Sequence, residues 1–126
     1  MERKTDMIYH ITTPIEWKLA QQSGEYTAPS LEIEGFIHCS TAIQVVPVAN
    51  AFYSNVDKLL LLYIDESKLT AELKWEAPAH IEGHDAPENS DQQLFPHIFG
   101  VINLEAVIEA VPLPKNAEGY SLPEGI

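Results

Sequence analysis

The alternation of hydrophobic and polar positions along the chain predicts short strands separated by short helices. Residues 7–12 are rich in β-branched and aromatic side chains, which is typical of a strand. Residues 59–65 form a near-continuous apolar run, which indicates a central strand that is buried on both faces. The same criteria predict four further strands, at residues 36–40, 73–76, 94–102 and 107–111.

A first helix is predicted directly after the first strand. Thr13 is a suitable N-cap, Pro14 suits the first helical position, and Glu16 completes a capping box. The helix is expected to end near Ser23, because Gly24 then occupies the C-terminal capping place.

A second helical region is predicted after the strand at residues 36–40. Either Ser40 or Thr41 begins a helical turn there, and the Ser40 hydroxyl can cap it by accepting a hydrogen bond from an unpaired N–H. Pro47 is then expected to begin a separate helix that continues through Ala51 and Phe52.

The connecting segments are predicted from turn-forming residues. Residues 26–30 are expected to form a loop, since Pro29 and Ser30 interrupt any regular pattern. Residues 65–69 are expected to form a turn or a single helical turn. Asn103 is expected to cap a short turn at residues 104–106.

The remaining segments are predicted to be irregular. Residues 78–93 are polar and acidic and contain proline and glycine, which predicts a mobile loop. Residues 1–6 are expected to fray, and residues 113–126 to form an irregular tail. The whole chain, residues 1–126, is therefore interpreted as one domain of the α+β class.

The charge of the chain restricts its partners. Asp and Glu number 19 against 7 Lys and Arg, which gives a formal net charge of −12, and Arg3 is the sole arginine. A surface this acidic repels phosphate backbones, so duplex nucleic acid is not an expected partner. One small phosphorylated ligand, held by backbone N–H groups and a single lysine, stays compatible with this charge.

The sequence also predicts a cytoplasmic location. The single cysteine, Cys39, cannot form an intrachain disulfide, which suits a reducing compartment. The longest strongly apolar run, residues 59–64, is too short to span a membrane, so no membrane partner is expected. Residues 1–6 lack the apolar core of a signal peptide.

Three histidines occupy matching settings in predicted strands. His10, His38 and His97 are each flanked by large apolar residues, whereas His80 and His84 fall in the predicted acidic loop and suit a solvated surface. A neutral imidazole donates from one nitrogen and accepts at the other, so a strand histidine can orient a ligand. Each could instead be a hydrogen-bonded core residue. A metal site is the weaker alternative, because the sequence lacks a close-spaced ligand pair.

The neighbours of these histidines have less specific alternatives. Adjacent strand residues point to opposite faces, so Cys39 does not pair with His38 and is expected to be a small buried hydrophobe. Lys74 and Glu76 flank Trp75 and could line a cleft, or they could be solvated around a packed indole. Helical spacing from Val48 and Ala49 gives Phe52 and Tyr53 the pattern of core residues.

Five segments together resemble the DUF952 family of small bacterial proteins. They are IYHI at 8–11, EGFIHCS at 34–40, LLYID at 61–65, KWE at 74–76 and FPHIFG at 95–100. This resemblance implies an ADP-ribosyltransferase-like fold: a split, strongly curved β-sheet with short flanking helices. The cleft of that fold binds NAD or a similar nucleotide in relatives.

The resemblance also implies roles for the three histidines. His10 matches a first-strand histidine that contacts the nicotinamide ribose, and His38 matches a residue that clamps the ring. His97 matches the late-strand polar position, where transferases of this fold commonly use a glutamate to orient the acceptor. RNA 2′-phosphotransferases of this fold also depart from that glutamate. Lys74 stands where the family often has arginine, and it lacks the bidentate fork that clamps phosphate.

Two hypotheses for function result. In the first, a histidine-lined cleft binds NAD or a related nucleotide and supports ADP-ribosyl or phosphotransfer chemistry. In the second, the chain is a non-catalytic ligand-binding or interaction module on the same fold. The candidate catalytic residues are His10, His38, His97 and Glu76. The candidate ligand-binding residues are His10, Phe36, His38, Ser40, Tyr53, Lys74 and Phe95. No metal ligand is assigned, and the sequence does not fix an oligomeric state.

Overall fold

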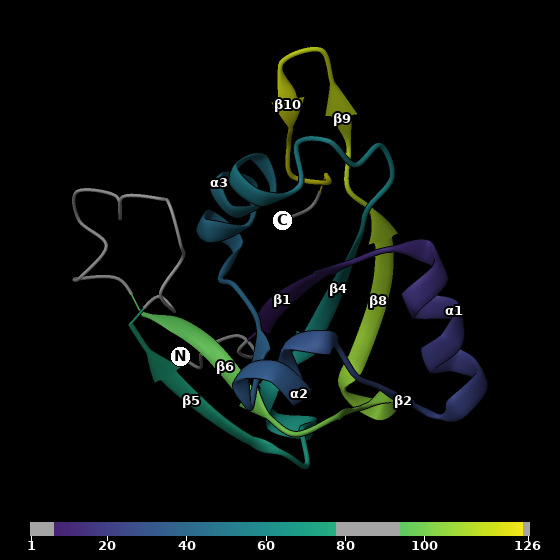
Figure 1. Cartoon of the computed structure of the whole chain (residues 1–126), viewed down its shortest axis with the longest axis vertical. Helices are drawn as coiled ribbons and strands as arrows, with labels where there is room; N and C mark the ends of the chain where they lie inside the picture. Colours follow the sequence, from purple (N-terminus) through teal and green to yellow (C-terminus); the bar gives the residue numbers. More distant parts are fainter. Residues whose placement is uncertain (1–6, 78–93, 125–126) are drawn as a thin grey trace, which may run out of the picture.

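Two three-stranded antiparallel sheets form the frame of the fold, and the computed structural model describes residues 7–77 and 94–124 (Figure 1). The first sheet has the strand order β1-β4-β8, with bounds Met7–Thr12, Leu60–Asp65 and Val107–Pro112. The second has the order β3-β6-β5, with bounds Ile37–His38, Phe95–Phe99 and Glu72–Glu76. The predicted α+β class is confirmed.

The two sheets meet where β1 passes the end of β3. Tyr9 and Ser40 form an isolated antiparallel bridge, in which each backbone N–H donates to the other residue's carbonyl, at 2.8 and 2.7 Å. The backbone N–H of Cys39 donates to the carbonyl oxygen of Pro96 at 3.0 Å. The segment after β3 is thus bonded to one strand of each sheet, and this junction brings β1 beside β3 and β6.

The predicted burial of the strand at residues 59–65 on both faces is confirmed. Leu61 and Leu62 are both fully buried, and successive strand side chains point to opposite faces. Leu62 belongs to a core cluster shared with β2, β3 and β6, whereas Leu61 belongs to a second cluster shared with α3 and the C-terminal segment. β4 therefore separates two hydrophobic clusters, which explains its continuous apolar run.

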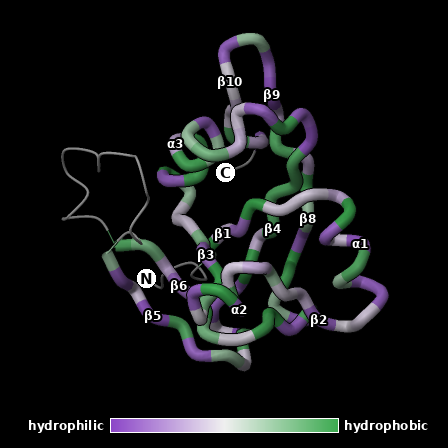
Figure 2. The backbone as a smooth tube through the Cα atoms, in the orientation of Figure 1, coloured by the Kyte–Doolittle hydropathy of each residue, from purple (hydrophilic) through white to green (hydrophobic). Residues whose placement is uncertain are grey.

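In the part of the chain that the structure describes, three α-helices flank the sheets and two 3-10 turns connect strands. The helices are α1 (Pro14–Ser23), α2 (Pro29–Glu34) and α3 (Ala42–Phe52), and the turns are η1 (Glu66–Lys68) and η3 (Leu104–Ala106). Figure 2 shows hydrophobic residues recurring along α3 and β4. Among the described residues, no helix is both long and apolar enough to cross a membrane.

The first helix begins and ends where the sequence predicts. The Thr13 hydroxyl accepts a hydrogen bond from the backbone N–H of Glu16 at 3.2 Å, and Gly24 ends the helix in a left-handed conformation with φ of 95°. The Glu16 carboxylate accepts a hydrogen bond from the Thr12 hydroxyl at 3.1 Å, which directs it toward the end of β1.

The predicted loop at residues 26–30 is wrong. Tyr26 ends the short strand β2 (Glu25–Tyr26), which pairs with β7 (Ile102–Asn103). Pro29 opens α2, because a proline lacks only an N–H that the first helical turn leaves unpaired. Gly35 ends α2 with φ of 93°, and its N–H donates to the carbonyl of Leu31 at 3.0 Å.

The two expected helical pieces after β3 are one helix. Thr41, not Ser40, is the N-cap of α3, since Ser40 is held in the bridge to Tyr9. Pro47 lies inside α3 and not at its start. It removes one helical hydrogen bond, yet the helix continues because Val45 and Ala49, on its inner face, are fully buried.

The expected strand at residues 94–102 is divided into β6 and β7. Gly100 lies in the break, where a Cβ atom would come within 2.9 Å of the Ala71 Cβ. Asn103 precedes η3 as predicted, but its side chain bonds elsewhere. It accepts a hydrogen bond from the Thr70 backbone N–H at 3.0 Å and donates one to the Lys68 carbonyl at 2.9 Å.

The expected irregular tail contains a hairpin. Strands β9 (Lys115–Asn116) and β10 (Gly119–Tyr120) pair at the top of the view in Figure 1. Leu113 and Tyr120 are each only 5% exposed, so this segment completes the second core cluster. The predictions for residues 1–6 and 78–93, including those for His80 and His84, lie outside the described residues.

Candidate functional site

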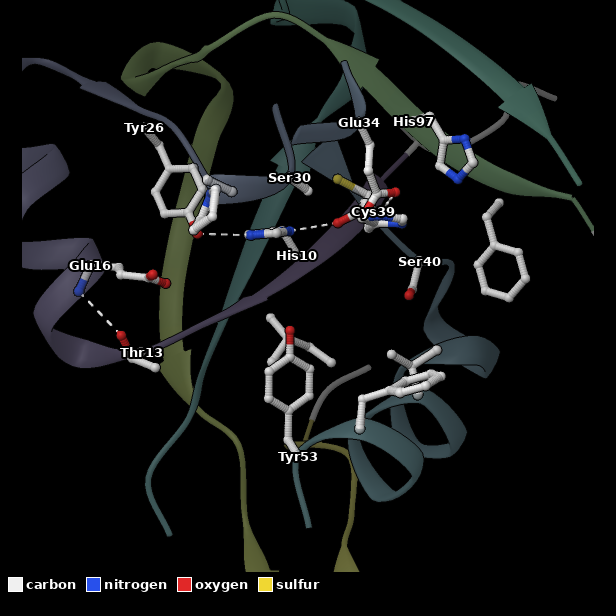
Figure 3. A pocket seen from close by; sticks show the side chains of 17 residues that line it. His10, Thr13, Glu16, Tyr26, Ser30, Glu34, Cys39, Ser40, Tyr53 and His97 are labelled. Carbon is white, nitrogen blue, oxygen red and sulfur yellow. Dashed lines mark hydrogen bonds and ion pairs between the residues drawn. The ribbon is translucent and has the colours of Figure 1, made fainter. Parts of the chain in front are cut away.

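One open pocket of about 610 Å³ lies where α1, α2 and α3 approach the junction of the two sheets (Figure 3). Its lining comes from four stretches of the chain, residues 10–16, 26–40, 48–53 and 95–97. The lining residues are His10, Ile11, Thr13, Glu16, Tyr26, Ala28, Pro29, Ser30, Glu34, His38, Cys39, Ser40, Val48, Phe52, Tyr53, Phe95 and His97.

The pocket brings together the three histidines that the sequence singled out. His38 and His97 lie opposite each other in the β3–β6 pair, and their ring centroids are 5.5 Å apart. His10 reaches the same pocket from β1, beside the bridge that joins the sheets. All three histidines therefore line one pocket.

His10 is held by protein groups at both ring nitrogens. Its Nδ1 lies 2.6 Å from the carbonyl oxygen of His38, and its Nε2 lies 2.8 Å from the hydroxyl of Tyr26. The side chain is buried, and burial lowers the pKa of His10 from 6.5 to about 4. His10 therefore has no free nitrogen for a ligand, which corrects the expected direct hydrogen bond.

Tyr26 extends this contact to a carboxylate at the pocket. Its hydroxyl lies 2.9 Å from the Thr12 hydroxyl, which in turn lies 3.1 Å from Glu16 Oε1. Burial raises the pKa of Tyr26, so its phenol stays protonated at neutral pH. Sequence reasoning missed Tyr26, because it falls in a segment that was expected to be a loop.

The buried His97 side chain is paired with Glu76, whose side chain is 41% exposed. Its Nδ1 lies 2.8 Å from Glu76 Oε1, and the His97 side chain is only 3% exposed. Phe36 stacks on the imidazole with ring centroids 4.2 Å apart and an interplanar angle of 19°. Neither Glu76 nor Phe36 lines the pocket, and both contact His97, which does.

His38 forms the corresponding pair at the pocket rim. Its Nε2 lies 2.9 Å from Glu34 Oε1, and both side chains are more than two-fifths exposed. The residues are four apart, across the end of α2 and the start of β3. The two histidines thus lie on neighbouring strands and each is paired with a partly exposed carboxylate, but only the His97 imidazole is buried.

Lys74, a predicted ligand-binding residue, does not line this pocket. Its ammonium group sits 5.0 Å from the centroid of the Phe99 ring and 3.9 Å from a carboxylate oxygen of Glu72. The neighbouring Trp75 is 42% exposed, so the alternative of a packed indole is wrong as well.

Ser40, Tyr53 and Phe95 line the pocket as expected. In Figure 3, Ser40 and Tyr53 enter it from opposite sides. Phe52 also lines it and is 44% exposed, which corrects its assignment to the core. Cys39 is 3% exposed and belongs to a core cluster, and burial raises the pKa of its thiol. The prediction that Cys39 is a small buried hydrophobe is confirmed.

The charged lining of the pocket is acidic. Its carboxylates are Glu16 and Glu34, and none of the described lining residues is a lysine or arginine. Within the described ranges, no group of three or more histidine, cysteine, aspartate or glutamate side chains is placed to hold a metal ion. The polar groups that the pocket offers are therefore imidazoles, hydroxyls and carboxylates.

Comparison with known proteins identifies relatives but no activity. The family model described as "Protein of unknown function (DUF952)" matches residues 11–110. A crystal structure of protein CC0527 from Caulobacter crescentus is similar, with a TM-score of 0.75 and 27% identity over 91% of this chain and 92% of that chain. A double mutant of CC0527 gives a TM-score of 0.74 and 26% identity, with the same coverage of both chains.

The solution NMR structure of CC0527 shows the same fold, with a TM-score of 0.63 and 24% identity over 90% of each chain. No curated protein matches the sequence.

Proposed function

Because the chain belongs to the DUF952 family, whose function is unknown, we propose from its pocket that it binds the nicotinamide–ribose end of NAD or of a related nucleotide. The observation that carries this proposal is the convergence of His38 and His97, each paired with a carboxylate, in one pocket with an acidic lining. The resemblance to proteins of ADP-ribosyltransferase-like fold supports the same class of ligand.

The size and lining of the pocket suit a nucleoside. Ligand pockets typically enclose about 300–1,000 Å³ and combine apolar walls with a few directed polar groups. This pocket has about 610 Å³, with Phe95 and Tyr53 as aromatic walls. His38 and Ser40 provide polar groups at the same place, suited to a ribose hydroxyl or an amide.

The charge of the pocket sets the orientation of the ligand. The nicotinamide ring of NAD carries a positive charge, which Glu16 and Glu34 attract. The phosphates of NAD would be repelled by these carboxylates, and Lys74 lies too far aside to compensate. The nicotinamide and its ribose are therefore proposed to enter the pocket, with the phosphates at its opening.

The His97–Glu76 pair suggests the chemistry. His97 donates its Nδ1 hydrogen to the Glu76 carboxylate, which leaves Nε2 as a proton acceptor. In the proposed reaction, nicotinamide leaves with the electrons of its bond to ribose, and an acceptor oxygen forms a bond to the same ribose carbon. The acceptor proton passes to His97 Nε2, while the pocket carboxylates stabilise the positively charged sugar.

Thermal denaturation with three ligands tests the proposal. Nicotinamide riboside and NAD are expected to raise Tm, and ADP-ribose, which lacks the nicotinamide, is expected to raise it less. His38→Ala should remove the shift, whereas Lys74→Ala, outside the pocket, should keep it. Equal shifts with all three ligands, or no shift with nicotinamide riboside and NAD, would contradict the proposed orientation or the proposed ligand.

A non-catalytic binding module is the second candidate. The resemblance places a histidine, His97, where transferases of this fold commonly have a glutamate, and this departure favours binding without turnover. The two candidates differ in one measurement, the release of nicotinamide from bound NAD. If nicotinamide is released and His97→Asn abolishes that release, the protein is a transferase or hydrolase. If NAD binds and stays intact, the protein is a binding module.

A further inference from the structure

A continuous chain of hydrogen bonds runs from the edge of the pocket into the buried side of β1. It links the Glu16 carboxylate to Thr12 at 3.1 Å, Thr12 to Tyr26 at 2.9 Å and Tyr26 to His10 Nε2 at 2.8 Å. It ends where His10 Nδ1 meets the His38 carbonyl oxygen at 2.6 Å. Thr12 and Tyr26 are 2% and 1% exposed, so water does not interrupt the chain at these two residues.

The number of hydrogen atoms available to these hydrogen bonds depends on whether Glu16 and His10 are charged. The His38 carbonyl can only accept, so His10 Nδ1 must carry the hydrogen of the last contact. If Glu16 is ionised and His10 is neutral, the other three contacts share only the two hydroxyl hydrogens. One contact then places two acceptors against each other, and one added proton completes the chain.

We propose that Glu16, Thr12, Tyr26 and His10 form a proton relay, in which one proton is shared between the carboxylate at the pocket and the buried imidazole. With the proton on Glu16, each group donates toward His10, and Tyr26 donates to Nε2. With the proton on Nε2, each group donates in the opposite direction, and Thr12 donates to the carboxylate. The two forms hold the same protons, so no other reactant is needed.

The relay makes Glu16 a positioning residue for His10, whatever ligand fills the pocket. Burial disfavours an imidazolium at His10, so the form with the proton on Nε2 is the less favourable of the two when no ligand is bound. A cationic group beside Glu16 favours the ionised carboxylate and shifts the proton to His10. A cationic ligand thereby changes the protonation of His10 without touching it.

Other titratable groups face the relay without belonging to it. They are Tyr53 at the end of α3, and His38 and Cys39 in and after β3. Burial raises the pKa of Tyr53 and of Cys39, so both stay protonated at neutral pH. The His38 imidazole is paired with Glu34, and only its main-chain carbonyl enters the chain. A pH response of the relay is therefore expected to depend on Glu16.

Glu16→Gln tests the relay in the protein without ligand. The amide of a glutamine donates to Thr12 permanently, so the chain is complete without the added proton. We expect Glu16→Gln to raise Tm by about 3 °C at pH 8, and this gain to be smaller at pH 5, because a lower pH favours the added proton in the wild type. Glu32→Gln makes the same charge change on α2 outside the chain, and should show no such difference between the two pH values.

Removing a hydroxyl from the middle of the hydrogen-bond chain distinguishes a relay from a direct electrostatic effect between Glu16 and His10. Tyr26→Phe keeps the buried ring and removes the central hydroxyl, and Thr12→Val removes the neighbouring hydroxyl if Tyr26→Phe fails to fold. When Glu16→Gln is added to either variant, it should no longer change Tm or the ¹⁵N chemical shift of His10 Nε2 in a pH-dependent way. The proposal is overturned if that effect survives the break, or if Glu16→Gln changes Tm equally at pH 5 and pH 8.

Discussion

The Nδ1 atom of His10 lies 2.6 Å from the main-chain carbonyl oxygen of His38, so a side chain of β1 is bonded to the backbone of β3. This contact adds to the backbone bridge between Tyr9 and Ser40 at the same junction. The wall of the pocket that carries His38 is thus held to the first sheet by both backbone and side-chain hydrogen bonds. His10 therefore helps to hold the site in position, since both of its ring nitrogens contact protein groups.

The tautomer of His10 follows from this contact. A carbonyl oxygen cannot donate a hydrogen bond, so the neutral imidazole must carry its hydrogen on Nδ1, and its Nε2, 2.8 Å from the Tyr26 hydroxyl, carries none. The ¹⁵N chemical shifts of the His10 ring at pH 7.5 should therefore show a protonated Nδ1 and an unprotonated Nε2. A neutral ring with the hydrogen on Nε2 would contradict this geometry.

The lowered pKa of His10 predicts that the protein loses stability in acid. Burial lowers this pKa from 6.5 to about 4, and Glu16→Gln leaves that burial in place while it removes the carboxylate of the relay. The unfolded state binds more protons between these values, so stability falls as pH falls through that window, by up to about 3 kcal/mol.

Urea denaturation of Glu16→Gln at pH 7 and pH 4.5 measures this loss. His10→Asn in the same background retains an amide that can donate to the His38 carbonyl and removes the titrating group, so its loss over this range should be smaller. Equal losses in the two proteins would show that His10 is not the group responsible.

Glu76 is expected to influence turnover more than binding. It touches His97 and does not line the pocket, and its carboxylate stabilises the imidazolium that forms when His97 accepts a proton. If NAD is cleaved, Glu76→Gln should lower the rate of nicotinamide release at least about tenfold with little change in Kd. Glu72→Gln, on the same strand, should leave both values unchanged.

Pro47 offers a test of the single helix α3. Its side chain is exposed, and its missing N–H leaves one helical hydrogen bond unmade. Pro47→Ala should therefore raise the free energy of unfolding by about 1 kcal/mol or more, because alanine restores the N–H and the helical propensity. If two separate helical pieces met at Pro47, the substitution would give no gain.

Local signals predicted those parts of the fold that depend on local chemistry. Thr13 and Gly24 bound α1 as expected, because a hydroxyl at an N-cap and a glycine at a C-terminus act within a few residues. Prolines were less informative, since Pro29 begins one helix and Pro47 lies inside another. Only the burial of Val45 and Ala49 against the core distinguishes these two cases.

The part of the site formed by strand histidines could be predicted from the sequence. The part that depends on contacts between elements far apart in the chain could not. Matching strand contexts selected His38 and His97, which are cross-strand partners at the pocket. No local pattern could place the Tyr26 hydroxyl against His10, because that contact depends on where β2 lies relative to β1. Lys74 and Glu76 are equivalent in the strand pattern, and only the pairing of Glu76 with His97 separates their roles.

Titration of the protein with nicotinamide riboside, followed through the imidazole NMR signals, shows whether this pocket binds the nicotinamide–ribose group. We expect saturable shifts of His38 and His97, while both ring nitrogens of His10 keep their protein partners. Weaker shifts should accompany ADP-ribose at the same concentration. Unchanged His38 and His97 signals at saturating nicotinamide riboside and NAD would contradict the claim that this pocket binds the nicotinamide–ribose group.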